Sequence, residues 1–539
     1  MDNELNIGMA FSGGGYRAAT YDLGTLSFLN SIRLDDGRTL LDCVTVLSSV
    51  SGGTIPALKY MLARSKGQPV GEMIRELFTF LCKEDLVTPA MNSIGAERGN
   101  RDSSSIKLMA EVYDEYLFGG ATMGDIIEKI DDIPVKDYTA LATDFDHSLP
   151  FRFRVTSGKT TQNEPLRYGY FGNGKNVIGS NVVPYITLGE AMACSSCFPS
   201  GFEPMMFPDD FKVSQVPEIA RNIKKRFGIM DGGIVDNQGI DPIVQAEKRM
   251  FKYRKDKTRK DKALDLVIIS DVSNSEIKDS YAPCEQLLPK CLGRLTLGRL
   301  RNYGLISESL AITLFIVALA FGNGFWLGVV TVVMIIVTLL NVAGALLKNK
   351  MFKAIEKTFI GDRARFISHL KFASAEAMLM NRAKSLIIMT SEVFLNRLRQ
   401  MNFGSVYKDS AWNNRLVTSN IHDLEPGDNW ERRRSEGNPE VIELIPSEAV
   451  QQNSALASGM GSTLWFTAED KEAGIPQALI STGQYNICRN LLVYVRRIEK
   501  DPTNTTDAHR LIIACKPQLE AAWEHFQQDP QWMVPELLD

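Results

Sequence analysis

Apolar residues in the first half of the chain fall into short runs that alternate with longer helical patterns. Continuous apolar runs of about four to eight residues are typical of buried strands, whereas apolar residues at three- and four-residue spacing are typical of helices. These patterns predict strands at 5–11, 44–47, 138–143, 151–155 and 264–270, and helices at 18–31, 73–81 and 106–117. Because strands alternate with helices, we expect a layered α/β unit.

The last third of the chain is mostly helical by the same criteria. Residues 364–401 carry apolar side chains at mixed three and four spacing, and 479–495 reads as a further helix. A polar loop with two glycines and two prolines is expected at 424–440. Short apolar runs predict strands at 441–445 and 464–466.

The longest stretch without a charged residue lies between Glu308 and Lys348. It is apolar at 309–321 and 325–347, and residues 322–324 between them form a Gly-Asn-Gly turn signal. The second run exceeds the roughly 20 residues that a bilayer crossing needs. Lysine and arginine flank both ends, which favours both ends on the cytoplasmic side. We therefore expect a transmembrane helical hairpin; a buried helix pair or an oligomer interface is the alternative.

Two glycine-rich turns each close a strand and open a helix. The first contains Gly13, Gly14 and Gly15, whose backbone N–H groups can converge on one negative charge. The second is Ser-Val-Ser-Gly-Gly at 49–53, in the strand-turn-helix setting that holds a serine on a sharp elbow. Such an elbow needs small neighbours because its backbone is strained. The two turns together provide an anion cradle and a candidate nucleophile, Ser51.

A nucleotide-binding loop is the alternative interpretation of the first turn. Strand, glycine loop and helix N-terminus also build dinucleotide sites. The spacing is not G-x-G-x-x-G, and no Gly-Lys-Ser/Thr follows. These departures disfavour nucleotide binding.

Four blocks of the chain resemble the patatin-like phospholipase family. The sequence F-S-G-G-G-Y-R-A at 11–18 is similar to the glycine-rich oxyanion loop of that family, and S-V-S-G-G at 49–53 to its G-x-S-x-G elbow. The block at 230–237 resembles the D-G-G/A motif that carries the catalytic aspartate, and 191–199 resembles the turn before its Pro-containing loop. The blocks follow the order of the family. One departure is Ser49, where the family usually has glycine.

The resemblance implies a fold and a catalytic pair. The fold would be a three-layer α/β/α patatin-like domain, a modified form of the α/β-hydrolase fold. The catalytic pair would be a Ser51/Asp231 dyad in which the carboxylate accepts the serine proton directly, since the five histidines lie outside the four blocks. Asp231 should then have a raised pKa.

Other residues of the same blocks have expected roles. The oxyanion donors would be the N–H groups of Gly13, Gly14 and Gly15. Arg17 would hold the loop or receive a lipid phosphate, and a structural salt bridge is the alternative. Asp236 and Asn237 are expected to shape the turn that follows Asp231.

Composition narrows the class of protein. The chain has 539 residues, 44% hydrophobic and 23% charged, with a net charge of −4, so nothing global argues for nucleic acid. Cys194 and Cys197 are the one close cysteine pair, and without a second pair or a nearby histidine we interpret them as helix packing rather than a zinc or redox site. No cofactor or metal is expected. The N-terminus carries no signal peptide, which points to the cytoplasmic side.

These expectations combine into a domain plan and a function. Residues 1–290 would form the N-terminal part of the catalytic domain, 305–347 the transmembrane hairpin, and 351–539 a C-terminal helical region that completes the domain. We expect a membrane-anchored serine lipid acyl hydrolase that crosses the bilayer twice, keeps its catalytic domain cytoplasmic and cleaves fatty-acyl esters of membrane glycerophospholipids. An acyltransferase and a catalytically silent membrane scaffold are the alternatives. Homo-oligomerisation stays open.

Overall fold

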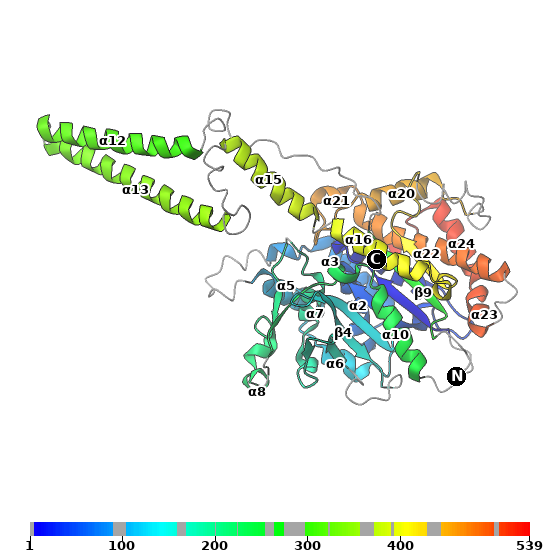
Figure 1. Cartoon of the computed structure of the whole chain (residues 1–539). Helices are drawn as coiled ribbons and strands as arrows, with labels where there is room; N and C mark the ends of the chain where they lie inside the picture. The colour runs from blue at the N-terminus through cyan, green and yellow to red at the C-terminus, as the bar shows by residue number, and fades with distance from the viewer. Residues whose placement is uncertain are drawn as a thin grey trace. The chain divides into compact units, whose positions relative to one another are not determined.

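The computed structural model describes residues 5–89, 104–158, 169–199, 201–221, 223, 225–253, 263–273, 297–321, 324–355, 371–389, 393–427, 444–500 and 506–538. Its internal contacts divide the chain into two units. Unit 1 consists of Met1–Lys278 and Thr390–Asp539, and unit 2 of Asp279–Met389 (Figure 1). Unit 1 contains the sheet and both glycine turns, so its fold decides how the site is built.

A mixed sheet forms the centre of unit 1. Its strands are β1 (Ile7–Phe11), β2 (Val44–Val50), β3 (Asp137–Asp144), β4 (Leu149–Thr156), β5 (Gly169–Gly172), β6 (Val177–Ile178), β7 (Met205–Phe207), β8 (Phe227–Asp231), β9 (Leu266–Asp271) and β10 (Leu416–Asn420). The order is β10-β9-β1-β2-β3-β4-β5-β6, and β8 pairs with both β3 and β7. The first five strands of this order are parallel, and β4, β5 and β6 continue it antiparallel.

Strand β3 is longer than its neighbour β2, and this difference positions the site. The pairing with β2 ends where Val50 lies opposite Leu141. On its other side β3 pairs with β4 along its full length. Strand β8 therefore takes the vacant edge beyond β2, antiparallel to β3, with Asp231 opposite Ala142. As a result β2 and β8 lie end to end along one edge of β3.

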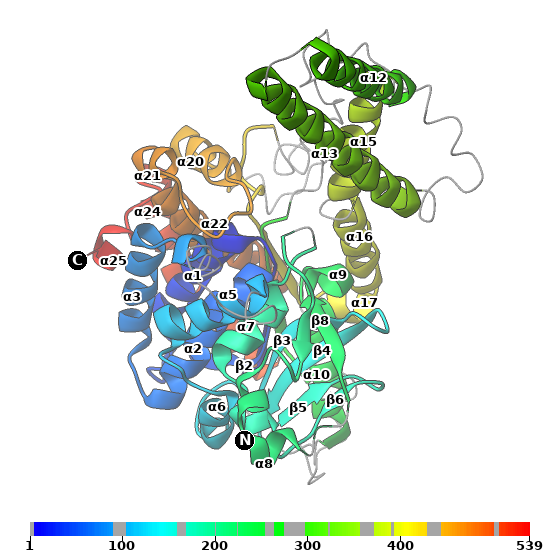
Figure 2. The same ribbon diagram turned by 90° about the vertical axis from the view of Figure 1, so that its left-hand side faces the viewer.

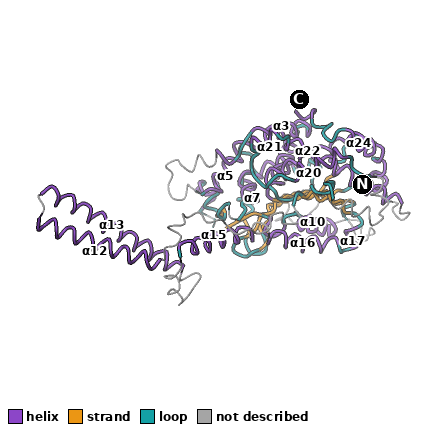
Figure 3. Tube along the Cα trace, turned by 90° about the horizontal axis from the view of Figure 1, so that it is seen from above, coloured by secondary structure: helices purple, strands orange, loops and turns teal. Residues whose placement is uncertain are grey.

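Helices cover both faces of the sheet. Those of unit 1 are α1 (Gly15–Ser31), α2 (Thr54–Lys66), α3 (Val70–Lys83), α5 (Ser105–Tyr113), α6 (Met123–Lys129), α7 (Leu188–Ser196), α8 (Pro217–Ala220), α9 (Gly233–Asp236), α10 (Ile240–Tyr253), α16 (Phe394–Tyr407), α17 (Ser410–Asn413), α20 (Glu448–Ser458), α21 (Ala468–Glu472), α22 (Ile475–Lys500), α23 (Asp507–Ala514), α24 (Lys516–Gln528) and α25 (Pro535–Leu538). Figure 3 shows the strands as one layer, with α3, α20, α22 and α24 on one side and α10, α16 and α17 on the other. The larger apolar core lies on the first side, and a smaller one lies between the sheet and α10, α16 and α17. The expected α/β fold with helices on both faces of a sheet is confirmed.

The C-terminal part of the chain packs directly on the first helix. Helix α22 crosses α1, and the two lie side by side in Figure 2. The crossing uses a glycine on each helix: a Cβ on Gly24 would come within 2.0 Å of the Ile480 carbonyl oxygen, and one on Gly483 within 2.0 Å of the Tyr21 carbonyl oxygen. The helix behind the first glycine turn is therefore held by residues from the other end of the chain.

Unit 2 contains α12 (Leu297–Phe321), α13 (Gly324–Ile355) and α15 (Phe372–Ile388). Helices α12 and α13 pack against each other, and the expected turn falls between them, at residues 322–323, which lie outside the described residues. Between the two helices, the Glu308 carboxylate accepts hydrogen bonds from the Thr338 hydroxyl at 2.6 Å and the Asn341 amide at 2.7 Å. A helical hairpin is therefore present.

The structure does not support the prediction that this hairpin crosses a membrane. In the described parts of the chain we find no helix with the length and apolar character needed to cross a bilayer. Helix α12 carries Glu308 near its middle, and its uncharged part, 309–321, is shorter than the roughly 20 residues that a crossing takes. The transmembrane hairpin therefore has no support in the structure.

Two expected strands differ from the structure. Residues 464–466 are not a strand: Leu464 and Phe466 bury their side chains in the core while the backbone runs past the start of α1. In the expected strand 441–445, the last two residues are irregular and 441–443 lie outside the described residues. Strand β10, which closes the parallel edge, has no expectation from the sequence. An apolar run predicts burial in each case, but long-range packing decides whether it joins the sheet.

Candidate active site

The serine elbow has the strained geometry that its sequence predicts. Ser51 follows β2 directly and has a positive φ of 48°, which is uncommon for a residue other than glycine. A Cβ on Gly52 would lie 2.2 Å from the Gly15 carbonyl oxygen, and one on Gly53 would lie 2.6 Å from the Ser12 carbonyl oxygen. The elbow therefore needs glycines because it packs against the backbone of the first glycine turn.

Asp231 ends β8 and meets Ser51, which follows the end of β2. The Ser51 hydroxyl is close enough to the Asp231 carboxylate to lower the pKa of that group. The backbone N–H of Gly233 donates a hydrogen bond to Asp231 Oδ1 at 2.6 Å. Asp231 is 5% exposed. Burial raises its pKa to about 7, and the interactions with Gly233 and Ser51 act in the opposite direction without cancelling the effect of burial.

Helix α7 fixes the backbone on both sides of this pair. The Ser51 N–H donates to the Ser195 hydroxyl oxygen at 3.0 Å, and the Gly232 N–H donates to the Ser195 carbonyl at 3.3 Å. The Asp231 N–H donates to the Cys197 carbonyl at 3.0 Å. The sequence pattern predicts no role for Ser195. Its place inside the 191–199 block is the signal that could have pointed to it.

The three glycines of the first turn differ in how their N–H groups are used. The Gly13 N–H donates to the Asn237 carbonyl at 3.0 Å, so it is already engaged within the protein. Among the described residues, the N–H groups of Gly14 and Gly15 have no acceptor. Gly15 is the first residue of α1, and the first N–H groups of a helix have no intrahelical partner. Two backbone donors next to the elbow are thus available to a ligand.

Asn237 and Asp236 shape the loop after the aspartate. The Asn237 side-chain amide donates to the Ser273 hydroxyl at 3.2 Å. The Asp236 carboxylate accepts hydrogen bonds from the backbone N–H groups of Gln238 at 3.2 Å and Asp241 at 2.7 Å. These bonds fit the turn-forming role expected for the two residues. In addition, the Asn237 carbonyl ties this loop to the first glycine turn through Gly13.

Arg17 is buried and faces the C-terminal part of unit 1. Its Nη1 donates to the Met460 carbonyl at 2.7 Å, and its Nη2 donates to the Ser462 hydroxyl at 3.1 Å. Neither contact follows from the sequence, because the partner segment lies more than 440 residues further along the chain. Of the roles expected for Arg17, these contacts favour that of holding the loop.

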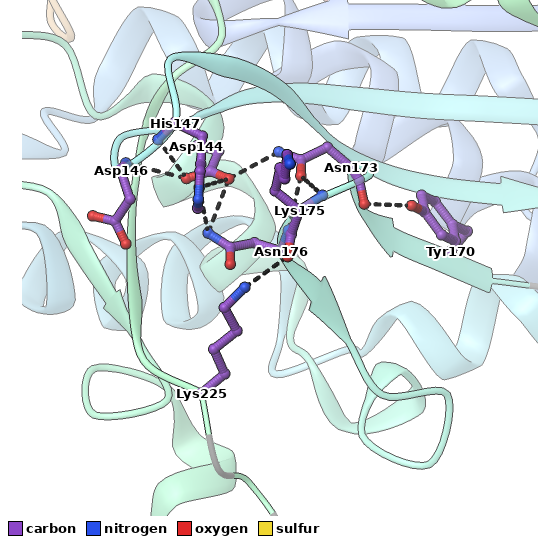
Figure 4. Close-up of polar contacts among 8 residues, drawn as sticks. All are labelled: Asp144, Asp146, His147, Tyr170, Asn173, Lys175, Asn176 and Lys225. Carbon is purple, nitrogen blue, oxygen red and sulfur yellow. Dashed lines mark hydrogen bonds and ion pairs between the residues drawn. The ribbon is translucent and has the colours of Figure 1, made fainter.

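A second polar cluster surrounds Asp144 and contains His147 (Figure 4). The buried Asp144 carboxylate ends β3 and accepts hydrogen bonds from His147 at 3.0 Å, Asn173 at 3.0 Å and Asn176 at 2.9 Å. These contacts lock the β3–β4 turn against the β5–β6 turn. Among the described residues, no histidine is hydrogen-bonded to Ser51, and the titratable group whose pKa the Ser51 hydroxyl affects is Asp231.

Cys194 and Cys197 are both free and buried. Cys197 Sγ donates to the Glu203 carbonyl at 2.9 Å, and Cys194 Sγ lies 3.5 Å from Met205 Sδ. Burial raises the pKa of both thiols well above the ordinary value. In the described residues no three His, Cys, Asp or Glu side chains gather as they would around a metal ion. Packing is the role that these contacts support.

Comparison with known proteins shows which family this part of the chain resembles. The model of the patatin-like phospholipase family matches residues 9–244, a range that includes both glycine turns and Asp231. No curated protein matches the chain. Among solved structures, human GIVD cytosolic phospholipase A2 is similar with a TM-score of 0.32 and 15% identity over 50% of this chain and 43% of that chain. The same enzyme in complex with methyl gamma-linolenyl fluorophosphonate is similar with a TM-score of 0.36 and 12% identity, over 98% of this chain and 60% of that chain.

The chain thus spans less than two thirds of either solved structure. The family match is the comparison that bears on the site, because its limits enclose every element that positions Ser51 and Asp231: β2, β3, α7 and β8. The part of this chain that matches the patatin-like phospholipase family thus contains Ser51, Asp231 and both glycine turns.

Proposed function

We propose that this chain is a serine lipid acyl hydrolase that cleaves fatty-acyl esters of glycerophospholipids. The observation that carries the proposal is that the ends of β2 and β8 bring Ser51 next to a buried Asp231 carboxylate whose pKa is raised to about 7. A base with a pKa near the working pH both accepts and returns a proton efficiently. The family match to patatin-like phospholipases supports an acyl ester of a lipid as the substrate class.

The proposed reaction uses the dyad twice. Ser51 Oγ attacks the ester carbonyl carbon while the Asp231 carboxylate accepts the hydroxyl proton. When the ester C–O bond breaks, the protonated Asp231 returns this proton to the leaving alcohol oxygen. Water then attacks the acyl-serine carbonyl carbon and gives a proton to Asp231. Asp231 passes this proton to Ser51 Oγ as the acyl–Oγ bond breaks, so that the free fatty acid leaves and the Ser51 hydroxyl is restored. The raised pKa of Asp231 suits both the acceptance and the return of the proton.

Gly14 and Gly15 are the oxyanion donors in this proposal. Their N–H groups lie at the N-terminus of α1, where the helix dipole also favours negative charge. Gly13, expected as a third donor, has its N–H engaged by the Asn237 carbonyl, so we assign it a role in holding the loop. Loss of one oxyanion donor raises the barrier by about 3 to 4 kcal/mol in enzymes of this type.

Fluorophosphonate labelling tests the proposal directly. Wild-type protein should react with a fluorophosphonate probe and release fatty acid from phosphatidylcholine in mixed micelles. Ser51→Ala should lose both, and Ser31→Ala, which changes a serine at the end of α1 away from the site, should keep both. If wild-type protein is labelled neither in detergent nor in membranes, the hydrolase proposal fails and the silent scaffold replaces it.

The same assay separates hydrolysis from acyl transfer. In the presence of a competing alcohol, a hydrolase continues to release free fatty acid, whereas an acyltransferase converts the acyl-enzyme into a new ester. Mass spectrometry of the products distinguishes the two. A product pool dominated by the new ester would replace hydrolysis by transfer on the same acyl-enzyme.

We further propose that unit 2 attaches the chain to the membrane that holds its substrate, with unit 1 on the cytoplasmic face. Helices α12 and α13 expose large apolar side chains that no other described part of the chain covers. These side chains are Ile306, Leu310, Ile312, Leu314, Ile316, Val317 and Leu319 on α12, and Phe325, Val329, Val332, Val333, Ile335, Ile336, Leu339 and Val342 on α13. Basic residues lie on both sides of this apolar stretch in the sequence. Lysine and arginine next to a membrane segment favour the cytoplasmic side, so these flanks support the proposed orientation.

Vesicle flotation tests the attachment. Wild-type protein should float with phosphatidylcholine vesicles, and the double variant Ile316→Asp/Val333→Asp should not, because each change puts a charge on an exposed apolar position of one helix. Tyr185→Asp, at an exposed apolar position in unit 1, is the control and should float like wild type. Wild-type protein that stays in the aqueous fraction would overturn the proposal.

Thiol labelling of intact cells tests the proposed side of the membrane. A membrane-impermeant thiol reagent should leave Asp36→Cys, an exposed position in unit 1, unreacted in intact cells and should label it once the cells are opened. Labelling of Asp36→Cys in intact cells would contradict a cytoplasmic catalytic unit.

A further inference from the structure

A short segment from the C-terminal part of unit 1 crosses the start of α1. We call residues 460–463 the strap. The Tyr16 N–H donates to the Thr463 carbonyl at 2.7 Å, and Arg17 donates to the Met460 carbonyl at 2.7 Å and to the Ser462 hydroxyl at 3.1 Å. The two residues that follow Gly15 are thus bonded to both ends of the strap.

The strap also touches the glycine turn itself. A Cβ on Gly15, which has a positive φ of 59°, would lie 2.3 Å from the Thr463 carbonyl oxygen. The Tyr16 ring packs on the Phe466 ring with 5.6 Å between centroids. The backbone of Gly15 is therefore confined by the strap on one side and by Gly52 of the elbow on the other.

The strap is anchored by buried residues at and beyond its ends, and its middle is exposed. It begins at the end of α20, and the residues after it, Leu464 and Phe466, are buried in the larger core. Gly461 and Ser462 are exposed. At its C-terminal end, the Thr463 hydroxyl donates to the carbonyl of Trp465, which follows the strap, at 2.7 Å. Arg17 is the side chain that joins the exposed middle to α1.

These contacts act on the proposed oxyanion donors. The first N–H groups of a helix have no intrahelical partner, so the start of α1 is held only by what packs on it. Thr463 satisfies one of these groups, the Tyr16 N–H, and Arg17 holds the strap in the position that allows this bond. The directions of the Gly14 and Gly15 N–H groups then depend on the strap.

We propose that Arg17 is a positioning residue that clamps the strap onto the Gly14–Gly15 turn and so aims the oxyanion donors at the ester carbonyl. This inference rests on the proposed hydrolase function. It assigns to Arg17 a task that is independent of the lipid head group, because both of its described hydrogen bonds go to the protein. A neutral ester without phosphate needs the same oxyanion donors as a phospholipid does.

Two substrates separate positioning from phosphate recognition. Arg17→Ala should lower kcat by about 10- to 100-fold for both p-nitrophenyl butyrate and phosphatidylcholine in mixed micelles, with KM changed less than about twofold, since bonds from a charged group are lost. The rate of fluorophosphonate labelling should fall by the same factor. If Arg17→Ala raises KM for phosphatidylcholine and leaves p-nitrophenyl butyrate unchanged, Arg17 binds phosphate and the inference is overturned.

A mutant cycle keeps the test independent of folding. Ser462→Ala changes an exposed residue and removes one of the two bonds, so it should lower kcat about threefold without a change in melting temperature. Combined with Arg17→Ala it should add nothing, because the two act as one unit. Additive effects would overturn the clamp. Arg38→Ala, which removes a half-buried surface arginine paired with Asp36, is the matched control and should leave kcat unchanged.

The inference and the underlying function fail in different ways. Wild-type protein that does not react with the fluorophosphonate overturns the hydrolase proposal. Wild-type protein that reacts, together with Arg17→Ala protein that is folded by circular dichroism and reacts at the same rate, overturns the positioning role alone.

Discussion

Ser51 and Asp231 are brought together by strand β3. Ser51 follows β2 and Asp231 ends β8, and both of these strands pair with the same edge of β3. Strand β2 stops with Val50 opposite Leu141, and β8 continues the same edge from the other direction with Asp231 opposite Ala142. The two side chains are therefore brought together by the backbone pairing of the sheet. Burial at this place raises the pKa of the Asp231 carboxyl group to about 7.

The first prediction concerns the pH dependence of the reaction. Asp231 must be ionised to accept the Ser51 proton, and its pKa in the folded protein is about 7. We therefore expect kcat/KM for p-nitrophenyl butyrate to rise about tenfold per pH unit below pH 7 and to level off above it. Initial rates between pH 5 and 9 measure this profile. A flat profile from pH 5 to 8 would show that Asp231 is not the base.

The second prediction concerns stability. The pKa of Asp231 is about 7 in the folded protein but near 4 in an unfolded chain. Between these values the folded state binds a proton that the unfolded state has lost, so the contribution of Asp231 to stability falls as the pH rises through this window. Asp231→Asn does not ionise and escapes this loss. The stability of this variant relative to wild type should therefore rise by about 3 kcal/mol from pH 4.5 to pH 8.

Urea unfolding of both proteins at the two pH values measures this difference. Ser51→Ala, which keeps the carboxyl group, is the control and should still lose stability as the pH rises. A difference between Asp231→Asn and wild type that is the same at both pH values would contradict the raised pKa.

The third prediction concerns the support of the elbow by α7. Ser195→Ala removes the acceptor of the Ser51 N–H and leaves that group without a partner next to the strained residue. An unsatisfied buried donor costs about 1 to 3 kcal/mol, so we expect fluorophosphonate labelling to slow by about tenfold or more. The neighbouring Ser196 hydroxyl donates to the Met192 carbonyl instead, and Ser196→Ala should slow labelling less than about threefold. Equal effects of the two changes would contradict a specific role for Ser195.

The fourth prediction concerns the contact between the two glycine turns. A Cβ at Gly52 would lie 2.2 Å from the Gly15 carbonyl oxygen and 2.5 Å from the Gly15 nitrogen, and backbone atoms cannot move away as a flexible side chain can. Gly52→Ala should displace the turn that carries the proposed donors and reduce labelling by about 100-fold, as the loss of an oxyanion donor does.

Gly71→Ala is the matched control for this change. Gly71 lies in α3, where an added Cβ would meet no atom of the described residues within 4 Å, and alanine favours a helix by about 1 kcal/mol over glycine. Its labelling should equal that of wild type, and its melting temperature should not fall. Wild-type labelling by Gly52→Ala would show that the two turns do not depend on each other.

Local features of the site could be predicted from the sequence because a few neighbouring residues determine them. The sequence around Ser51 passes from a strand to a helix through a short turn of small residues, which predicts a strained backbone there. The positive φ of Ser51 confirms the strained elbow. Alternating strands and helices predict the α/β fold for the same reason. The raised pKa of Asp231 agrees with the expectation for a carboxylate that is removed from water.

Only the tertiary structure decided which hydrogen-bond partner each donor and acceptor of the site has. The Gly13 N–H is engaged by Asn237, Ser195 holds the Ser51 N–H, and the strap reaches Arg17 from 443 residues away. The failed strand at 464–466 has the same origin, since its apolar side chains are buried as expected while its backbone follows the start of α1. Hydrophobic pattern and turn chemistry are local, so the sequence displays them. The partner of a backbone N–H depends on which distant segment packs there, and only the assembled fold determines that.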